Sequence, residues 1–124
     1  MIHHVSVGTN DLKRARVFYD AVMPFIGFRF IKQNERIIGY GLTDVVFSVE
    51  TPFDRSAASP GNGGHVAFRA GSRKHVQAFY EAGLKNGGTD DGPPGIRSYD
   101  RHYYAAFLRD PDGNKVEIVT HSAD

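Results

Sequence analysis

The chain has 124 residues, of which 40% are hydrophobic and 23% charged, and its formal net charge is +1. This length predicts one domain with a buried core, and the near-neutral charge without a basic block argues against a nucleic-acid partner. Cysteine is absent, which excludes disulfides and thiol catalysis. No apolar run is long enough to cross a bilayer and no secretory signal pattern is present, so we expect a cytoplasmic protein without membrane contact.

The first half of the chain reads as a strand, a helix and three more strands. Residues 2–8 predict a strand. A helix over about 11–23 follows, because Asn10 or Asp11 can cap its first turn and apolar residues then recur at helical spacing. Three short strand candidates come next, over residues 27–32, 36–42 and 45–50. The turn-rich stretch 51–63 then separates the two halves of the chain.

The second half repeats this order. Residues 64–70 predict a strand, and a helix runs from about Ser72 to Lys85. Residues 103–110 and 114–121 predict a hairpin around an Asp-Pro-Asp-Gly turn, while the strand before residue 103 gives only a faint pattern.

An internal repeat supports this division. At an offset of 61 residues (65 − 4), His4-Val5 falls on His65-Val66, and "FYDA" at 18–21 falls on "FYEA" at 79–82. Two matches at one offset indicate two similar halves. We therefore predict an α+β fold in which one domain, residues 1–124, contains two βαβββ modules: a first module at 1–50 and a second module at 64–121.

Alternation along the strands selects candidate site residues. Side chains of a strand point to opposite faces in turn, so His4 lies on the face opposite to the apolar valines of the first strand. By the same rule His65 shares a face with Arg69, and Glu117 lies opposite Val116 and Ile118. We expect the apolar faces to pack under the helices and the other faces to line a concave site.

His4, His65 and Glu117 together form a plausible set of two histidines and one carboxylate. Such a set binds a divalent first-row metal ion and leaves coordination positions open for water or substrate. The residues are far apart in sequence, so the prediction depends on strand alternation and on the repeat. His3 is the competing candidate for the first position.

Three stretches of the chain resemble the glyoxalase / bleomycin-resistance / dioxygenase group, also called the vicinal oxygen chelate superfamily. They are "IHHVSVGTNDLKRARVFYDAV", "GNGGHVAFRAGSRKHVQAFYEAGLKNGG" and "YYAAFLRDPDGNKVEIV". The resemblance implies paired βαβββ modules that curl around a cavity. It also implies a divalent metal ion (Zn, Ni, Mn or Fe) bound by residues that fall on His4, His65 and Glu117, so that two adjacent oxygens of a small substrate can chelate it.

The sequence departs from the glyoxalase I pattern of that superfamily at a fourth ligand. The pattern has a glutamate on the last strand of the first half, where alignment of "VVFSVETP" with "KVEIVTH" places Phe47 or Ser48 opposite Glu117. Glu50 comes two residues later. We keep Glu50, and Glu117 itself, as candidates for a catalytic base, and Ser48 as a candidate substrate contact.

Three further residues are candidates for substrate binding. Arg69 points to the predicted cavity, where it could bind an anionic substrate or pair with an acid. His102 and Tyr103 precede the hairpin and could form a substrate wall, an aromatic edge or a dimer contact.

Two functions fit these residues. The first is a metal-dependent lyase, isomerase or dioxygenase acting on a small vicinal-oxygen substrate. The alternative is a metal-free, bleomycin-resistance-like protein that binds a small molecule. A homodimer is expected in either case, because this fold commonly places modules edge to edge across a twofold axis.

Overall fold

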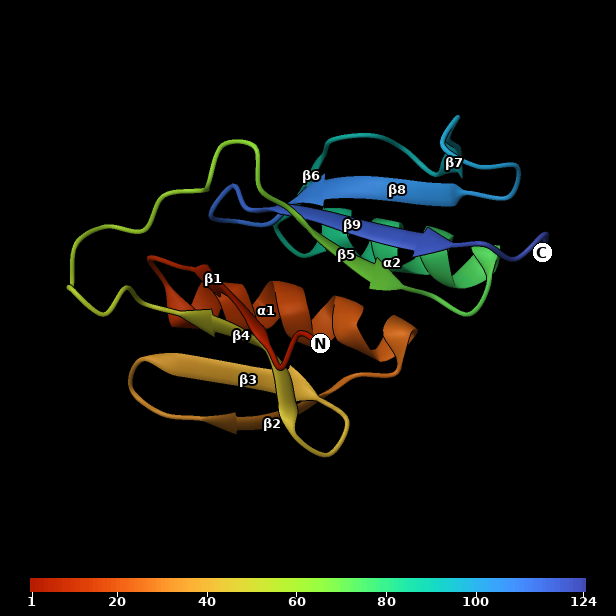
Figure 1. Ribbon diagram of the computed structural model, residues 1–124. Coiled ribbons are helices and arrows are strands. Elements are labelled where there is room, and N and C mark those ends of the chain that lie inside the picture. Colours follow the sequence, from red (N-terminus) through yellow and green to blue (C-terminus); the bar gives the residue numbers. More distant parts are fainter.

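The computed structural model describes residues 1–124 and places one sheet and one long helix in each half of the chain (Figure 1). The elements of the first module are β1 (Val5–Gly8), α1 (Leu12–Val22), the 3-10 helix η1 (Met23–Ile26), β2 (Arg29–Gln33), β3 (Ile37–Gly41) and β4 (Val45–Glu50). Its strands lie in the order β1-β4-β3-β2. In Figure 1 this sheet lies below the second one, and the loop 51–63 projects at one side.

The second module has the same plan. Its elements are β5 (Val66–Arg69), α2 (Arg73–Lys85), β6 (Thr89–Asp90), β7 (Gly95–Ile96), β8 (Tyr104–Arg109) and β9 (Lys115–Thr120). The strand order is β5-β9-β8-β6, with β7 also paired to β8. The mixed sheets and helices confirm the predicted α+β fold, and the faint strand before residue 103 is two short strands.

The two sheets also share their strand register. In the first sheet β1 runs parallel to β4, with Ser6 opposite Ser48. In the second sheet β5 runs parallel to β9, with Ala67 opposite Glu117. Because Ser6 and Ala67 are related by the repeat, Ser48 occupies in the first module the position that Glu117 occupies in the second.

Side-chain caps start both helices, and both first strands start later than predicted. Asp11 accepts a hydrogen bond from the Arg14 amide at the start of α1, and Ser72 accepts one from the His75 amide at the start of α2. The strands β1 and β5 begin at residues 5 and 66, so the histidines at positions 4 and 65 lie just before them rather than within them.

One hydrophobic core spans both modules. The helices α1 and α2 pack against each other and against their own sheets. Phe68 of β5 lies between the modules, since its ring centroid is 5.1 Å from that of Phe47 and 6.2 Å from that of Phe28. Where α2 packs on α1 and β8, a Cβ on Gly83 would lie 3.2 Å from Phe18 Cε2 of α1 and 2.5 Å from Leu108 Cδ1 of β8. The absence of a side chain at Gly83 therefore suits this close approach.

The turn between β8 and β9 ties the second module to α1. The buried Asp110 carboxylate accepts a hydrogen bond of 2.6 Å from the Tyr19 hydroxyl and others from the amides of Asp112 and Asn114. Asp112 in turn accepts hydrogen bonds from the Asn10 amide, 2.9 Å, and from the Arg14 guanidinium, 2.7 Å. The Asp-Pro-Asp-Gly turn and the "FYDA" helix are thus partners in one structural contact.

Candidate functional site

His65 and Glu117 meet on the face of the second sheet that is turned away from α2. His65 Nε2 lies 3.0 Å from Glu117 Oε1, and the Tyr103 hydroxyl donates a hydrogen bond to Glu117 Oε2. The Glu117 side chain is only 3% exposed, whereas 42% of the His65 side chain is open to solvent. A buried carboxylate is thus held between one imidazole and one phenol.

The phenol stays protonated in this environment. Burial, followed by the hydrogen bond to Glu117 and its negative charge, raises the pKa of Tyr103 to about 12. Tyr103 is therefore a hydrogen-bond donor to Glu117 at neutral pH. This interaction occupies one oxygen of the carboxylate and leaves the other directed to His65.

A cavity of about 480 Å³ opens beside this pair. Its lining combines two cations, two carboxylates, a histidine and three aromatic rings: Arg97, Lys115, Asp91, Glu117, His65, Tyr99, Tyr103 and Phe107, together with Gly92. Asp91 is paired with Arg109 at 3.0 Å and with Lys115 at 3.7 Å. The cavity can accommodate a small, ring-bearing molecule next to the His65–Glu117 pair.

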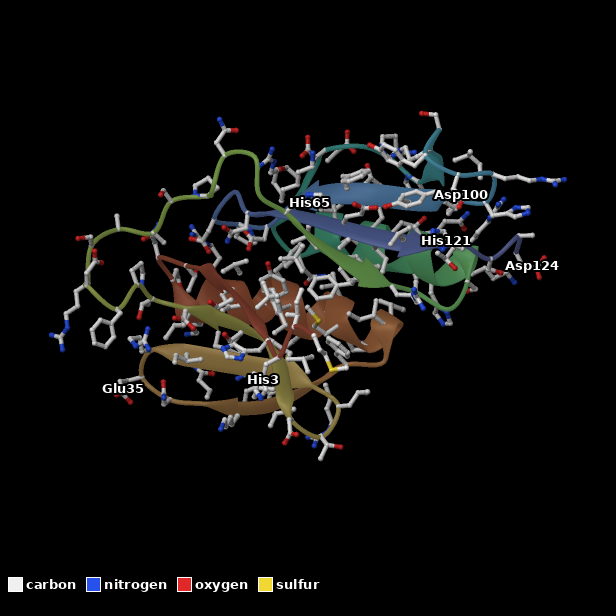
Figure 2. All side chains as sticks on the ribbon, viewed as in Figure 1. His3, Glu35, His65, Asp100, His121 and Asp124 are labelled. Carbon is white, nitrogen blue, oxygen red and sulfur yellow. The ribbon has the colours of Figure 1, made fainter.

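His4 lies in a different cavity, on the first sheet. That cavity has a volume of about 410 Å³ and is lined by His3 and His4 together with Ser48 and Glu50. The Nδ1 atoms of His3 and His4 are 2.9 Å apart. In Figure 2, His3 lies over the lower sheet and His65 at the upper one.

Within one chain, then, the structure brings together only two residues of the predicted metal set. It contains no group of three or more histidine, cysteine, aspartate or glutamate residues that could hold a metal ion. Strand alternation predicted that both histidines face a site, and each of them lines a cavity. It could not show that the two sheets present separate cavities.

The candidates Glu50 and Ser48 interact with each other rather than with His65 and Glu117. Arg36 Nη1 lies 3.2 Å from Glu50 Oε1, and the Ser48 hydroxyl lies 3.3 Å from Glu50 Oε2. Glu50, which lines the cavity of the first sheet, is therefore paired with the guanidinium of Arg36.

The remaining sequence candidates lie at different distances from the site. Tyr103 contacts Glu117 directly, whereas Arg69 is exposed and neither Arg69 nor His102 lines the second-sheet cavity. Sequence reasoning missed Lys115 and Arg97 as lining residues. Lys115 shares the strand face of Glu117, which was an available signal, but Arg97 follows the two-residue strand β7, whose pattern was too short to assign a face.

The donor atoms of the pair suit a divalent metal ion. Imidazole nitrogen and carboxylate oxygen both bind Zn²⁺, Ni²⁺, Mn²⁺ and Fe²⁺. The separation of 3.0 Å between His65 Nε2 and Glu117 Oε1 is close to that expected for neighbouring ligands of an octahedral ion with bonds of about 2.1 Å. His65 and Glu117 are thus compatible with two positions of a metal site.

Comparison with known proteins assigns the family. The family model of the Glyoxalase/Bleomycin resistance protein/Dioxygenase superfamily matches residues 1–118, and the chain belongs to that superfamily. A glyoxalase/bleomycin resistance protein from Albidiferax ferrireducens T118 is 39% identical, with a TM-score of 0.87 over 95% of this chain and 96% of that one.

More distant structures support the fold alone. A glyoxalase-related enzyme from Fulvimarina pelagi is 21% identical, with a TM-score of 0.77 over 97% of this chain and 87% of that chain. An E144Q mutant of glyoxalase I from Zea mays is 23% identical, with a TM-score of 0.75. The match covers 95% of this chain but 46% of the maize chain. No curated protein matches the sequence, and no helix is long and apolar enough to traverse a bilayer.

Proposed function

We propose that this protein is a divalent-metal-dependent enzyme that acts on a small molecule with two adjacent oxygens, as a lyase, isomerase or dioxygenase. The observation that carries the proposal is the His65–Glu117 pair, whose donor atoms are 3.0 Å apart beside a cavity of about 480 Å³. Membership of the superfamily supports the same assignment.

The third ligand in this proposal is His4 of a second copy of the chain. His4 and the His65–Glu117 pair lie in separate cavities of one chain. A twofold homodimer could oppose the first sheet of one copy to the second sheet of the other, which would give two equivalent sites. Each site would then contain His4 from one copy and His65 with Glu117 from the other.

The chemistry of such a site follows from its residues. A bound divalent ion supplies a positive charge that stabilises an oxyanion developing on the substrate. Tyr103 fixes the orientation of Glu117, and the aromatic rings of the lining would contact the substrate. Glu50 lies in the same cavity as His4, so the dimer would place this carboxylate within the shared site as a candidate base. Glu117 is the alternative base.

Metal content is the first test. The purified protein is expected to hold about one divalent ion per chain, and His65→Ala should lose it. His75→Ala is the matched control, because His75 is an exposed histidine on α2 and is outside both cavities. A wild-type protein that binds none of Zn²⁺, Ni²⁺, Mn²⁺ and Fe²⁺ would refute the metal-dependent mechanism.

A complementation experiment tests the shared site. His4→Ala and His65→Ala are each expected to lack metal, and their subunits are exchanged by unfolding and refolding an equal mixture. In a shared-site dimer, half of the dimers are mixed and each carries one intact site, so about a quarter of the metal sites return. If every site is built within one chain, no metal returns.

One observation favours the alternative, a metal-free small-molecule binding protein. Ser48 stands where the repeat would place a second glutamate, and Glu117 is already satisfied by His65 and Tyr103. In that case the protein would bind no metal, and His65→Ala would change ligand affinity but not metal content. The metal content of the wild type and of His65→Ala distinguishes the two functions.

A further inference from the structure

The guanidinium of Arg97 is held by backbone carbonyls rather than by a carboxylate. Its Nη1 donates a hydrogen bond of 3.0 Å to the Gly95 carbonyl, and its Nη2 donates one of 2.7 Å to the Pro93 carbonyl. Neutral backbone oxygens thus fix the guanidinium without neutralising it. Two of its five N–H groups are used in this way, and three remain for another acceptor.

The other charges of the second-sheet cavity are already paired. Lys115 lies 3.7 Å from Asp91, which also binds Arg109, and Glu117 is in contact with His65. Arg97 forms no ion pair and lines the same cavity. Arg97 is therefore the one cation in the lining that lacks a carboxylate partner.

Two glycines make room for this guanidinium. A Cβ at Gly95 would lie 3.2 Å from Arg97 Nη1, and a Cβ at Gly92 would lie 3.3 Å from Nη2. Gly92 also has a φ of +143°, a conformation that side-chain-bearing residues rarely adopt. The loop is thus shaped closely around the Arg97 head group, whose Cζ lies 5.5 Å from the centre of the Phe107 ring.

We propose that Arg97 binds a carboxylate group of the substrate, so that the protein selects small, carboxylate-bearing molecules. A planar guanidinium held in place presents paired N–H donors that match a carboxylate. The single unpaired positive charge of Arg97 is complementary to a single negative charge on the ligand. The inference rests on the proposed function, which places the two adjacent oxygens of the substrate at His65 and Glu117. The substrate carboxylate that Arg97 binds would then lie at a separate position of the same cavity.

Calorimetric titration of the zinc-loaded protein tests this proposal. The probes are 3,4-dihydroxybenzoate and 3,4-dihydroxybenzamide, which share a ring and an oxygen pair and differ in one charge remote from that pair. The benzoate is expected to bind about tenfold more tightly, the lower end of the effect of one charged hydrogen bond. Arg97→Gln should weaken the benzoate by this factor and leave the benzamide unchanged.

Arg29→Gln is the matched control. Arg29 is likewise held by two backbone carbonyls, those of Leu42 and Phe30, and has no carboxylate partner, but it is outside the cavity. It should retain the preference for the benzoate. Arg97→Lys, which keeps the charge and loses the planar fork, should reduce the preference severalfold, and it decides the question if Arg97→Gln does not fold.

Separate readouts distinguish the proposal from the function on which it rests. A protein that binds none of Zn²⁺, Ni²⁺, Mn²⁺ and Fe²⁺ refutes the metal site, and the comparison is then made with benzoate and benzamide on the metal-free protein. Equal affinities of the charged and neutral probes for the wild type overturn the role of Arg97. A preference that persists unchanged in Arg97→Gln overturns it as well.

Discussion

The hydrogen bond between Tyr19 and Asp110 links α1 of the first module to the β8–β9 turn of the second, and Tyr19→Phe removes it without creating a cavity. Both side chains are buried, and the carboxylate keeps its bonds to the Asp112 and Asn114 amides. One hydrogen bond to a charged group contributes about 1.5–3 kcal/mol. We expect a loss of about 2 kcal/mol in the free energy of unfolding, which lowers Tm by about 8 °C for a chain of this size.

The assay is chemical and thermal unfolding followed by circular dichroism. The repeat supplies its own control, because Tyr80 is the counterpart of Tyr19 at the same offset. The Tyr80 hydroxyl donates to Asp90 at 2.8 Å, and that contact is exposed to solvent. Tyr80→Phe should therefore leave Tm nearly unchanged, since an exposed hydroxyl exchanges one partner for water.

The Tm shifts of Tyr19→Phe and Tyr80→Phe can refute this reasoning. Equal shifts in Tyr19→Phe and Tyr80→Phe would mean that burial does not determine the contribution of the bond. A double-mutant cycle with Asp110→Asn adds a second check. If the two substitutions were strictly additive, the contact between the modules would not be the source of the lost stability.

Two further predictions concern the helix contact and the tyrosines. Gly83→Ala should lower the free energy of unfolding measured in urea titrations, because the added Cβ would meet Leu108 and Phe18. Such overpacking costs about 1–3 kcal/mol, which outweighs the better helix propensity of alanine, worth about 1 kcal/mol. A stabilised variant would contradict this reasoning. Burial raises the pKa of Tyr19 and of Tyr40 above the ordinary value of 10.0. Their stabilisation is fully present below pH about 10 and is lost as the pH rises, because only the unfolded chain then releases these protons. Tyrosinate absorbance of these residues should appear together with the loss of circular dichroism, and its appearance in the folded protein would refute the prediction.

The sequence predicted the fold well because its signals are local. Strand alternation and helix caps such as Asp11 act over a few residues, and the repeat at an offset of 61 residues shows the same local pattern twice. The same alternation identified His65 and Glu117, which the structure brings together. Alignment of the two halves left Phe47 or Ser48 as the counterpart of Glu117, and the strand register selects Ser48.

Features that depend on the packing of one module against the other could not be predicted. Helical spacing could not show that Gly83 of α2 is buried against Phe18 of α1 and Leu108 of β8, while its neighbour Leu84 is 40% exposed. The separation of His4 from His65 has the same origin, since it depends on how the two sheets are placed in space.

The shared core determines what a single module could do alone. Phe68 packs against Phe47 and Phe28, and α2 packs against α1, so each module completes the interior of the other. A chain that carried only one βαβββ unit would expose this apolar surface to water and would be stable only when paired with another unit. The repeat within this sequence thus has the form of a dimer whose two subunits are joined end to end, with residues 51–63 as the connection.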